Sequence, residues 1–203
     1  FLSADTALLK SELRAAALAR RDALDAGFRA SASREAADRA KPILVDLTGL
    51  VVSAYWPIRS EADPLPLLAI ATERGAVAAL PVTTPSGLLF RRWQHGEPLM
   101  PAGFDTMGPP PASPEVTPDL MIMPLAAFDR RLHRIGYGKG HYDRAIDALT
   151  ATGRRPRLLG LAFAAQEVDK VPDEPDDIPL DFIVTEEELI AADHPGPSAG
   201  HGY

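Results

Sequence analysis

The chain has 203 residues, of which 46% are hydrophobic and 24% are charged, and its 21 Lys and Arg against 28 Asp and Glu leave a formal net charge of −7. Such a composition is typical of a globular chain that closes one core, and the absence of Cys excludes disulfide scaffolds and cysteine nucleophiles. The acidic balance argues against a nucleic-acid partner. Because the sequence shows neither a signal-peptide pattern nor an apolar run of roughly 18 residues, we expect a cytoplasmic protein without membrane attachment. We also expect a monomer.

The first half of the chain alternates predicted helices and strands. Residues 5–24 contain no Gly or Pro and predict a helix, and residues 31–41 predict a second helix that stops at Pro42. Residues 50–56 predict a buried strand. The remaining elements of this half are a helix from Asp63-Pro64 to Gly75 and strands at 76–83 and 88–93.

The second half continues this alternation after a proline-rich segment at 94–118, which predicts an irregular surface loop. The elements expected after it are a strand at 119–123, a glycine-rich turn at 136–140, a helix at 141–152 and strands at 158–163 and 182–185. Strand and helix in alternation imply an α/β protein with a three-layer, Rossmann-like fold, in which helices cover both faces of a mostly parallel sheet. We expect one domain over residues 1–193 and a flexible tail over 194–203.

Three cations share one face of the first predicted helix. At about 100° per residue, Lys10, Arg14 and Arg21 lie within about 40° of one another. A separate apolar face is expected to meet the core and comprises Leu9, Leu13, Ala16 and Leu24. The default interpretation of the cationic face is a solvated surface, and a ligand site is the alternative.

Charge is also unevenly placed further along the chain. Residues 130–157 are mostly basic, whereas residues 167–193 are acidic with Lys170 as the single cation. A basic pole on an acidic protein favours a small anionic ligand over a long polyanion. A basic face that is simply solvated explains the same pattern equally well.

The segment with the most chemistry runs from residue 134 to 144. Alternate glycines within 136–140 permit positive φ and can turn several amide N–H groups toward one anion, to which the following helix adds its N-terminal N–H groups. Arg134 and Lys139 can contact phosphate oxygens, and Asp143 is placed to hold Mg²⁺ beside them. The spacing matches neither GxxxxGK[ST] nor GxGxxG, so a tight loop without a ligand is an equal alternative. Acids are also favoured in any first helical turn.

Further candidates lie near predicted strand ends, where ligands of parallel sheets bind. Trp56 and Glu61 can supply an aromatic wall and an acceptor for the N–H of a heterocycle, although a core edge and a helix-flanking acid explain them as well. Asp181 precedes an apolar strand and is either a turn residue or a second metal carboxylate. Sequence spacing does not decide between these two roles.

One long run matches a known family. PLAAFDRRLHRIGYGKGHYDR at 124–144, preceded by DLMIM, resembles the 5-formyltetrahydrofolate cyclo-ligases, also called 5,10-methenyltetrahydrofolate synthetases. The resemblance covers nearly the whole chain in the order of the family's segments. The other similar segments are KSELR (10–14), YWP (55–57), EAD (61–63), GLAF (160–163) and LDFIVT (180–185).

The resemblance implies an ATP- and Mg²⁺-dependent ligase that converts 5-formyltetrahydrofolate to 5,10-methenyltetrahydrofolate and releases ADP and phosphate. It further implies an ATP site comprising Lys10, Arg14, Arg134, Ile135, Gly136, Tyr137, Gly138, Lys139, Gly140, His141 and Tyr142. The implied folate site comprises Trp56, Glu61, Tyr137, Gly138, Lys139, Gly140 and His141. The implied metal ligands are Asp143 and Asp181, and Lys139 is the residue we expect to stabilise the transferring phosphoryl group.

Two departures from the family pattern concern the same segment. His141 stands where many members have Tyr, and the loop before Arg134 lacks the usual Gly. A non-catalytic, regulatory nucleotide-binding module on the same fold is one alternative, which would bind ATP without folate-dependent ADP release. A sugar-phosphate or acyl-transfer enzyme is another, and it would need neither the pair of Lys10 and Arg14 nor Mg²⁺.

Overall fold

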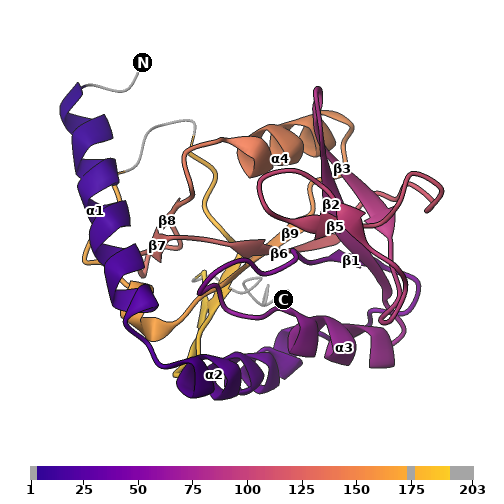
Figure 1. The fold of residues 1–203 in the computed structure, drawn as a ribbon, viewed down its shortest axis with the longest axis horizontal. Helices are drawn as coiled ribbons and strands as arrows, with labels where there is room; N and C mark the ends of the chain where they lie inside the picture. The colour runs from indigo at the N-terminus through magenta and orange to yellow at the C-terminus, as the bar shows by residue number, and fades with distance from the viewer. Residues whose placement is uncertain (1–3, 173–176, 193–203) are drawn as a thin grey trace, which may run out of the picture.

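The computed structural model describes residues 4–172 and 177–192, and its centre is a sheet of strand order β11-β10-β9-β6-β1-β2-β3 (Figure 1). The strands are β1 Val51–Ser53, β2 Val77–Thr84, β3 Gly87–Arg92, β6 Leu120–Pro124, β9 Arg157–Leu161, β10 Phe182–Val184 and β11 Leu189–Ala191. The central strands from β10 to β2 are parallel, and only the edge strands β3 and β11 are antiparallel. The predicted mostly parallel sheet is confirmed.

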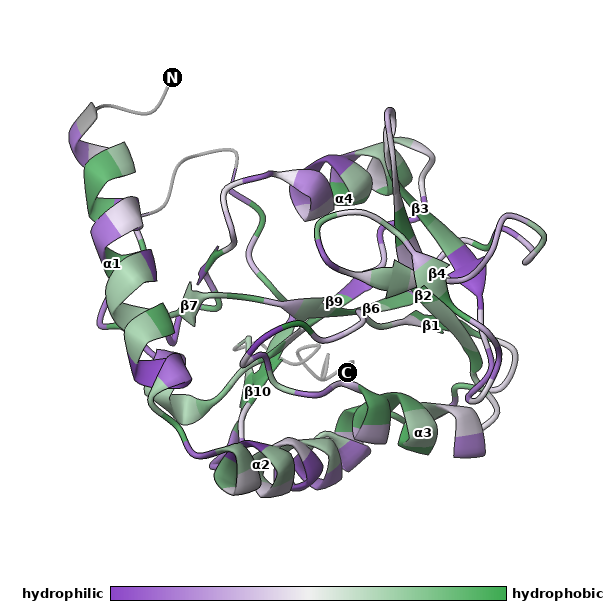
Figure 2. Ribbon diagram, viewed as in Figure 1, coloured by the Kyte–Doolittle hydropathy of each residue, from purple (hydrophilic) through white to green (hydrophobic). Residues whose placement is uncertain are grey.

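Helices cover both faces of this sheet, so the predicted three layers are also confirmed (Figure 1). The helices are α1 Ala4–Asp22, α2 Ala26–Arg39, α3 Leu65–Glu73 and α4 His141–Ala151, with short 3₁₀ turns η1 Lys41–Ile43 and η2 Ala164–Gln166. One core cluster joins Val52 to the α2 and α3 side, and another joins Met121 and Ile183 to Ile146 of α4. Because β6 is buried on both faces, its LMIM run lacks polar alternation (Figure 2). Within the described ranges, no helix has the length and apolar character needed to cross a membrane.

Two short hairpins lie outside the main sheet and were not predicted. β7 (Ala127–Phe128) pairs with β8 (Arg134–Ile135), and β4 (Met100–Pro101) pairs with β5 (Met107–Gly108). The prediction of an irregular loop over 94–118 is therefore wrong for its centre. Strands of two residues are too short to show an alternation in the sequence.

Two element boundaries also differ from prediction. The helix α2 begins at Ala26 rather than at residue 31, because Asp25 caps it by accepting from the backbone N–H groups of Gly27 (2.8 Å) and Phe28 (3.2 Å). The strand β11, which was not predicted, extends the sheet beyond β10. The tail predicted over 194–203 lies outside the described residues.

The inward face of α1 carries the cations, so the predicted orientation of this helix holds only in part. Leu9 is 46% exposed, whereas Arg21 is only 4% exposed. The apolar contact of this helix centres on Ala17, which packs with Ala127 and Ile135 of the β7–β8 hairpin. Of the predicted apolar face, Leu13 is partly buried against this cluster and Leu24 against the core beside α2, whereas Leu9 lies outside both.

Candidate active site

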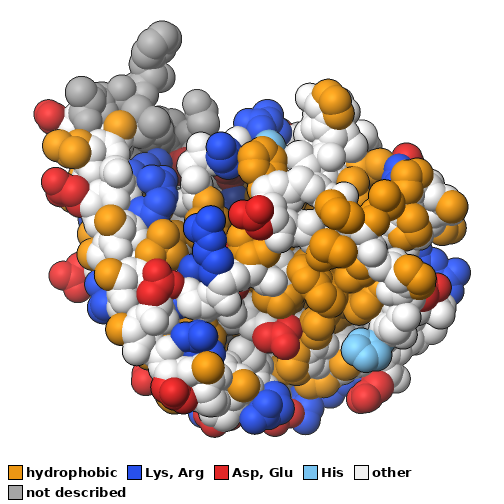
Figure 3. Space-filling model, in the orientation of Figure 1, with side chains coloured by type: hydrophobic (Ala, Val, Ile, Leu, Met, Phe, Trp, Pro, Cys, Tyr) orange, Lys and Arg blue, Asp and Glu red, His pale blue; other side chains and the backbone are white. Residues whose placement is uncertain are grey.

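A cavity of about 760 Å³ lies at the carboxyl ends of β1 and β6, between α1, the β4–β5 hairpin and the start of α4. Figure 3 shows this hollow, with Lys and Arg side chains along it. The volume is in the range of small-molecule sites, about 300–1,000 Å³. The predicted site residues that line the cavity are Lys10, Arg14, Trp56, Glu61, Arg134, Ile135, Gly136, Tyr137, Gly138, Lys139, Gly140, His141, Tyr142 and Asp143. Of the predicted residues, Asp181 alone is missing from this wall.

The glycine-rich turn lines the cavity, and several of its backbone amides have no partner within the described residues. Gly138 (φ +84°) and Gly140 (φ +62°) adopt positive φ, whereas Gly136 does not, so the prediction holds for two of the three glycines. The backbone N–H groups of residues 137–140 donate to no other group in the part of the chain that the structure describes. The helix α4 then begins at His141 without a side-chain cap, which adds its own N-terminal N–H groups. Such an arrangement favours an anion.

The left-handed conformation of Gly138 makes a test of this turn possible. We expect Gly138→Ala to weaken nucleotide binding about tenfold, because a side chain at φ +84° costs roughly 1–2 kcal/mol and shifts the neighbouring amides. Calorimetric titration with ATP measures the loss. Gly136→Ala is the matched control, since its φ is ordinary and an added Cβ meets nothing within 4 Å. Equal affinities of the two variants would contradict the anion-binding role of the turn.

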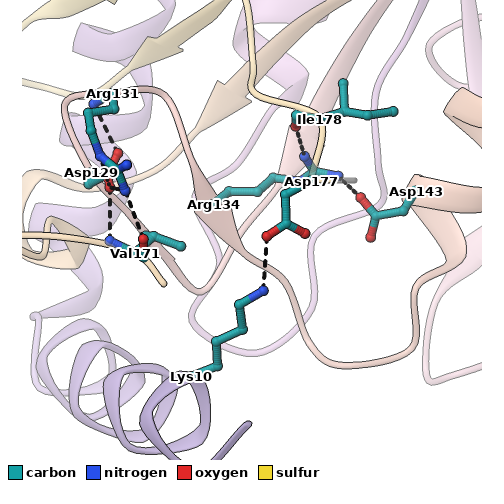
Figure 4. Close-up of polar contacts among 8 residues, drawn as sticks. All are labelled: Lys10, Asp129, Arg131, Arg134, Asp143, Val171, Asp177 and Ile178. Carbon is teal, nitrogen blue, oxygen red and sulfur yellow. Dashed lines mark hydrogen bonds and ion pairs between the residues drawn. The ribbon is translucent and has the colours of Figure 1, made fainter. Parts of the chain in front are cut away.

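The cations of α1 are tied to the walls of the cavity, so the solvated interpretation of this face is wrong. The Arg14 Nε donates to the Gly136 carbonyl oxygen at 2.8 Å. The Lys10 Nζ lies 3.0 Å from the Asp177 carboxylate (Figure 4). Arg21 is buried against the cavity wall. The helix α1 thus brings positive charge to the cavity beside the glycine-rich turn.

Arg134 and Asp143 form an ion pair on the cavity wall. Arg134 is anchored by the carbonyl oxygen of Ile178 at 3.1 Å, and its second terminal nitrogen donates to Asp143 Oδ1 (Figure 4). The Arg134 side chain is 8% exposed, whereas that of Asp143 is 60% exposed. The ion pair uses one carboxylate oxygen, and among the residues that the structure describes Asp143 Oδ2 has no partner, so it can accept a cation.

Asp181 lies at the amino-terminal ends of β9 and β10, away from the cavity, and this corrects the predicted pairing with Asp143. Its carboxylate accepts from the Leu158 N–H at 2.7 Å and pairs with Arg155 at 3.0 Å, beside the start of β9. Asp181 precedes β10, whereas the cavity lies where the parallel strands end. The cavity wall carries Asp177 instead, next to the Ile178 carbonyl that anchors Arg134.

No group of three or more His, Asp or Glu side chains within the described ranges could hold a metal ion as a closed cage. Mg²⁺ does not need one, because it is bound by one or two carboxylates together with phosphate oxygens and water. The open oxygen of Asp143 beside the unpaired amides fits that donor set.

Glu61 and Trp56 form another wall of the cavity. Glu61 Oε2 accepts from the backbone N–H of Ile58 at 2.9 Å. Burial raises the pKa of Glu61, while the hydrogen bond from the Ile58 N–H and the proximity of the Tyr137 hydroxyl and of Arg21 lower it. Trp56 packs edge-on against Trp93 with 6.2 Å between the ring centroids. Trp56 and Glu61 therefore line the cavity and also lie at the margin of the core.

Phe104, at the tip of the β4–β5 hairpin, covers the glycine-rich turn. Its ring centroid lies 5.1 Å from that of His141 and 5.1 Å from the Lys139 Nζ. Phe104 and Asp105 both have positive φ, +49° and +61°, which allows the tight tip. A lone aromatic residue in a proline-rich segment gives no sequence pattern, so this contact was not predicted.

The hydrogen bond of His141 fixes which ring nitrogen carries its proton. The Arg144 Nη2 lies 3.0 Å from His141 Nδ1, and a guanidinium only donates, so Nδ1 accepts and the neutral ring is protonated at Nε2. That Nε2 is buried and has no hydrogen-bond partner among the residues that the structure describes. Burial and the nearby cations Arg144 and Lys139 lower the pKa of His141. The ring therefore offers one N–H to a ligand oxygen.

A parallel α/β sheet with an amide-lined turn at its carboxyl edge is typical of enzymes that bind phosphate-bearing ligands. The family model of the 5-formyltetrahydrofolate cyclo-ligase family matches residues 7–186. The 5-formyltetrahydrofolate cyclo-ligase of Mycolicibacterium smegmatis is 30% identical over 72% of this chain and 78% of its own length. That of Escherichia coli K12 is 32% identical over 66% of this chain and 76% of its own length.

Solved structures agree with these relatives. The NMR structure of Aquifex aeolicus 5,10-methenyltetrahydrofolate synthetase has a TM-score of 0.77 and 28% identity, and the match covers 96% of this chain and 99% of that one. The 5,10-methenyltetrahydrofolate synthetase of Mycoplasma pneumoniae shares the fold, with a TM-score of 0.68 and 22% identity over 87% of this chain and 98% of that one. The chain therefore belongs to the 5-formyltetrahydrofolate cyclo-ligase family and is a ligase.

Proposed function

We propose that the protein uses ATP to convert 5-formyltetrahydrofolate to 5,10-methenyltetrahydrofolate, with release of ADP and phosphate. The observation that carries the proposal is the row of unpaired amides at 137–140, which shares one cavity with Glu61 and Trp56. Family membership supplies the folate class of substrate. The amides and the surrounding cations supply the chemistry that a triphosphate needs.

The nucleotide end of the cavity is the turn with the cations of α1. The amides of residues 137–140 would hold the terminal phosphates, with Lys10 and Arg14 across from them. Lys139 is exposed and takes part in no ion pair within the described ranges, so its charge can serve the transferring phosphoryl group. Phosphoryl transfer depends mostly on positioning and on charge stabilisation, which these groups provide.

The residues present fit a magnesium ion at Asp143. When bound, the metal neutralises negative charge on the phosphate oxygens. Asp143 would hold it through its second oxygen, and Asp177, which pairs with Lys10 at 3.0 Å, is a further carboxylate of the cavity lining. We do not assign this role to Asp181, because its carboxylate lies beside the start of β9, away from the cavity.

The folate end of the cavity is formed by Glu61, Trp56 and His141. Glu61 would accept an N–H of the pterin ring, and Trp56 would contact its flat face. His141 would donate from Nε2 to an oxygen of the formyl or phosphoryl group. These contacts would hold the formyl oxygen in line with the γ-phosphate.

The chemistry requires activation because an amide oxygen is a poor leaving group. The formyl oxygen attacks the γ-phosphorus, forming an O–P bond while the bond to ADP breaks. The N10 nitrogen then attacks the activated carbon and gives up its proton, and the C–O bond breaks as phosphate leaves with the electron pair and takes up that proton. Lys139 and the amides of the turn balance the charge that develops on the transferring group.

Mixing the protein with 5-formyltetrahydrofolate and Mg-ATP tests the proposal. We expect the absorbance of the methenyl product to rise together with release of ADP, and neither to occur when the folate is omitted. A non-hydrolysable ATP analogue should bind without product formation. Binding of ATP without folate-dependent ADP release would instead indicate a regulatory nucleotide-binding module.

A further inference from the structure

A buried arginine at the end of α1 joins two walls of the cavity. The Arg21 side chain is only 4% exposed, and burying a charge without a close counter-charge is costly. Its Nε donates to Ser60 Oγ at 2.9 Å, and its Nη1 donates to the Tyr137 hydroxyl at 2.5 Å. The nearest carboxylate, that of Asp22, is 3.9 Å from Nε and 62% exposed. Within the described residues, the hydrogen bonds of this cation therefore go to hydroxyl groups from two distant segments.

The first of these segments is the loop after β1, which carries Glu61. The hydroxyl of Ser60 accepts from Arg21, because a guanidinium has no acceptor, and it donates its own hydrogen to Asp22. The next residue, Glu61, accepts from the Ile58 N–H at 2.9 Å through its carboxylate and donates to the Ile58 carbonyl oxygen at 3.1 Å through its backbone. This loop is thus closed on itself, and Arg21 fixes it to α1.

The second segment is the start of the glycine-rich turn. Arg14, seven residues before Arg21 on the same helix, donates to the Gly136 carbonyl oxygen at 2.8 Å. Arg21 holds the next residue, Tyr137, by its hydroxyl, and the guanidinium lies 5.8 Å from the centroid of the ring. The backbone N–H groups of 137–140 donate to no group within the described ranges. Side chains of α1 therefore do the anchoring here that backbone hydrogen bonds do elsewhere.

A guanidinium is well suited to such a bridge. Its donors lie in one plane at fixed angles, whereas a lysine ammonium is a point charge on a flexible stem. Two hydroxyl groups bound to one guanidinium are therefore held at a fixed separation. Because one hydroxyl belongs to the wall with Glu61 and the other to the wall with the unpaired amides, the same side chain relates both walls.

We infer that Arg21 is a positioning residue that holds the loop of Ser60 and the glycine-rich turn at a fixed spacing across the cavity. The inference rests on the proposed function, because it deepens the way in which that site aligns its two ligands. On that function, the folate is bound beside Glu61 and the terminal phosphate of ATP at the turn. Phosphoryl transfer needs the reacting atoms in line and about 3–3.5 Å apart. A change in the spacing of the walls should therefore slow the transfer more than it weakens either ligand alone.

Arg21→Met tests the bridge, because it keeps an unbranched stem and removes both donors. We expect kcat, measured from methenyl absorbance, to fall about 100-fold, since misplacing the reacting groups by about 1 Å costs that much. The dissociation constants of ATP and of 5-formyltetrahydrofolate, each measured alone by calorimetry, should change less than about threefold. Loss of both affinities with the parent kcat would show that Arg21 contacts the ligands directly and would overturn the inference.

Arg21→Lys separates the bridge from the charge. It keeps a cation at the end of α1 but does not offer two donors in a fixed plane. We expect its kcat to stay as low as that of Arg21→Met, and recovery of the parent kcat would refute the bridge. Ser60→Ala and Tyr137→Phe each remove one end. Their double variant should match Arg21→Met, because all these changes act through one bridge.

Arg20→Met is the matched control. It removes the same charge from the same helix, but the Arg20 guanidinium binds the carbonyl oxygens of Ala165 at 2.6 Å and Glu167 at 3.0 Å, outside the cavity. We expect this variant to keep the parent kcat and both dissociation constants. A loss of kcat as large as that of Arg21→Met would show that loosening α1 is enough, which would contradict a specific role of Arg21.

A readout without turnover separates this inference from the proposed function. In NMR spectra of the ligand-free protein, Tyr137→Phe should shift the backbone amide resonance of Glu61, and Ser60→Ala should shift that of Gly138. Both cross effects should vanish in the Arg21→Met background, because the bridge transmits them. If the parent has no cyclo-ligase activity but this pattern occurs, the positioning role stands and the proposed function fails. If the parent is active and the cross effects are missing, the positioning role is overturned. Should Arg21→Met not fold, the Arg21→Lys background serves for the same comparison.

Discussion

Replacing Lys139 with alanine should lower kcat about 10²- to 10³-fold, because a preorganised group that stabilises developing charge contributes on this order. The same change should leave the Tm nearly unchanged. Lys139 is exposed, and its contact is a cation–π interaction with Phe104 at 5.1 Å. Such a contact at an exposed site is worth about 0.5–1 kcal/mol, too little to explain a loss of that size by unfolding.

The measurement compares the rate of methenyl formation with thermal melting of the same preparation. Lys170→Ala is the control, since Lys170 is equally exposed and lies outside the cavity. It should leave both quantities unchanged. A large drop in Tm with intact turnover in Lys139→Ala would show that this lysine is structural.

Replacing Asp143 with asparagine should raise the Mg²⁺ concentration needed for half-maximal activity by at least about tenfold. An amide keeps the shape of the side chain but loses the negative charge that Mg²⁺ prefers. The change also removes the ion pair with Arg134, whose anchor on the Ile178 carbonyl remains. The turn should therefore keep its place while the metal affinity falls.

A Mg²⁺ titration at saturating ATP and folate measures this effect. Asp147→Asn is the matched control, because Asp147 is exposed on the same helix and does not line the cavity. Its titration curve should coincide with that of the parent chain. If Asp143→Asn also gave the parent curve, the carboxylate would serve only to hold Arg134.

The sheet could be predicted because its signals are local. The run Leu120–Pro124 is apolar at every position, which indicates a strand buried on both faces, and glycines or prolines mark most element ends. The orientation of α1 could not, because its amphipathic pattern does not reveal that this helix packs on a hairpin. Leu9 faces solvent for that reason, and Arg21 faces inward.

The candidate site likewise combines features that the sequence predicts with features that it does not. The turn was evident from its glycines, and the resemblance supplied Arg14, which the fold brings to Gly136 across 122 positions of sequence. Asp177 and Asp181 lie four residues apart before the same strand, so the sequence does not show which of the two carboxylates reaches the cavity. The contact of Phe104 with His141 and the hydrogen bond of Arg21 to the Tyr137 hydroxyl arise from tertiary packing, and no sequence pattern predicts them.

If the unpaired amides of residues 137–140 bind ATP as proposed, they also link the stability of the fold to the ATP concentration. Folding leaves these donors to water, and a ligand that satisfies them binds the native chain but not the unfolded one. On the proposed function, ATP at about 100 times its dissociation constant adds roughly 2.7 kcal/mol to the free energy of unfolding. On that proposal, the protein would be less resistant to unfolding and proteolysis when the ATP concentration falls toward its dissociation constant.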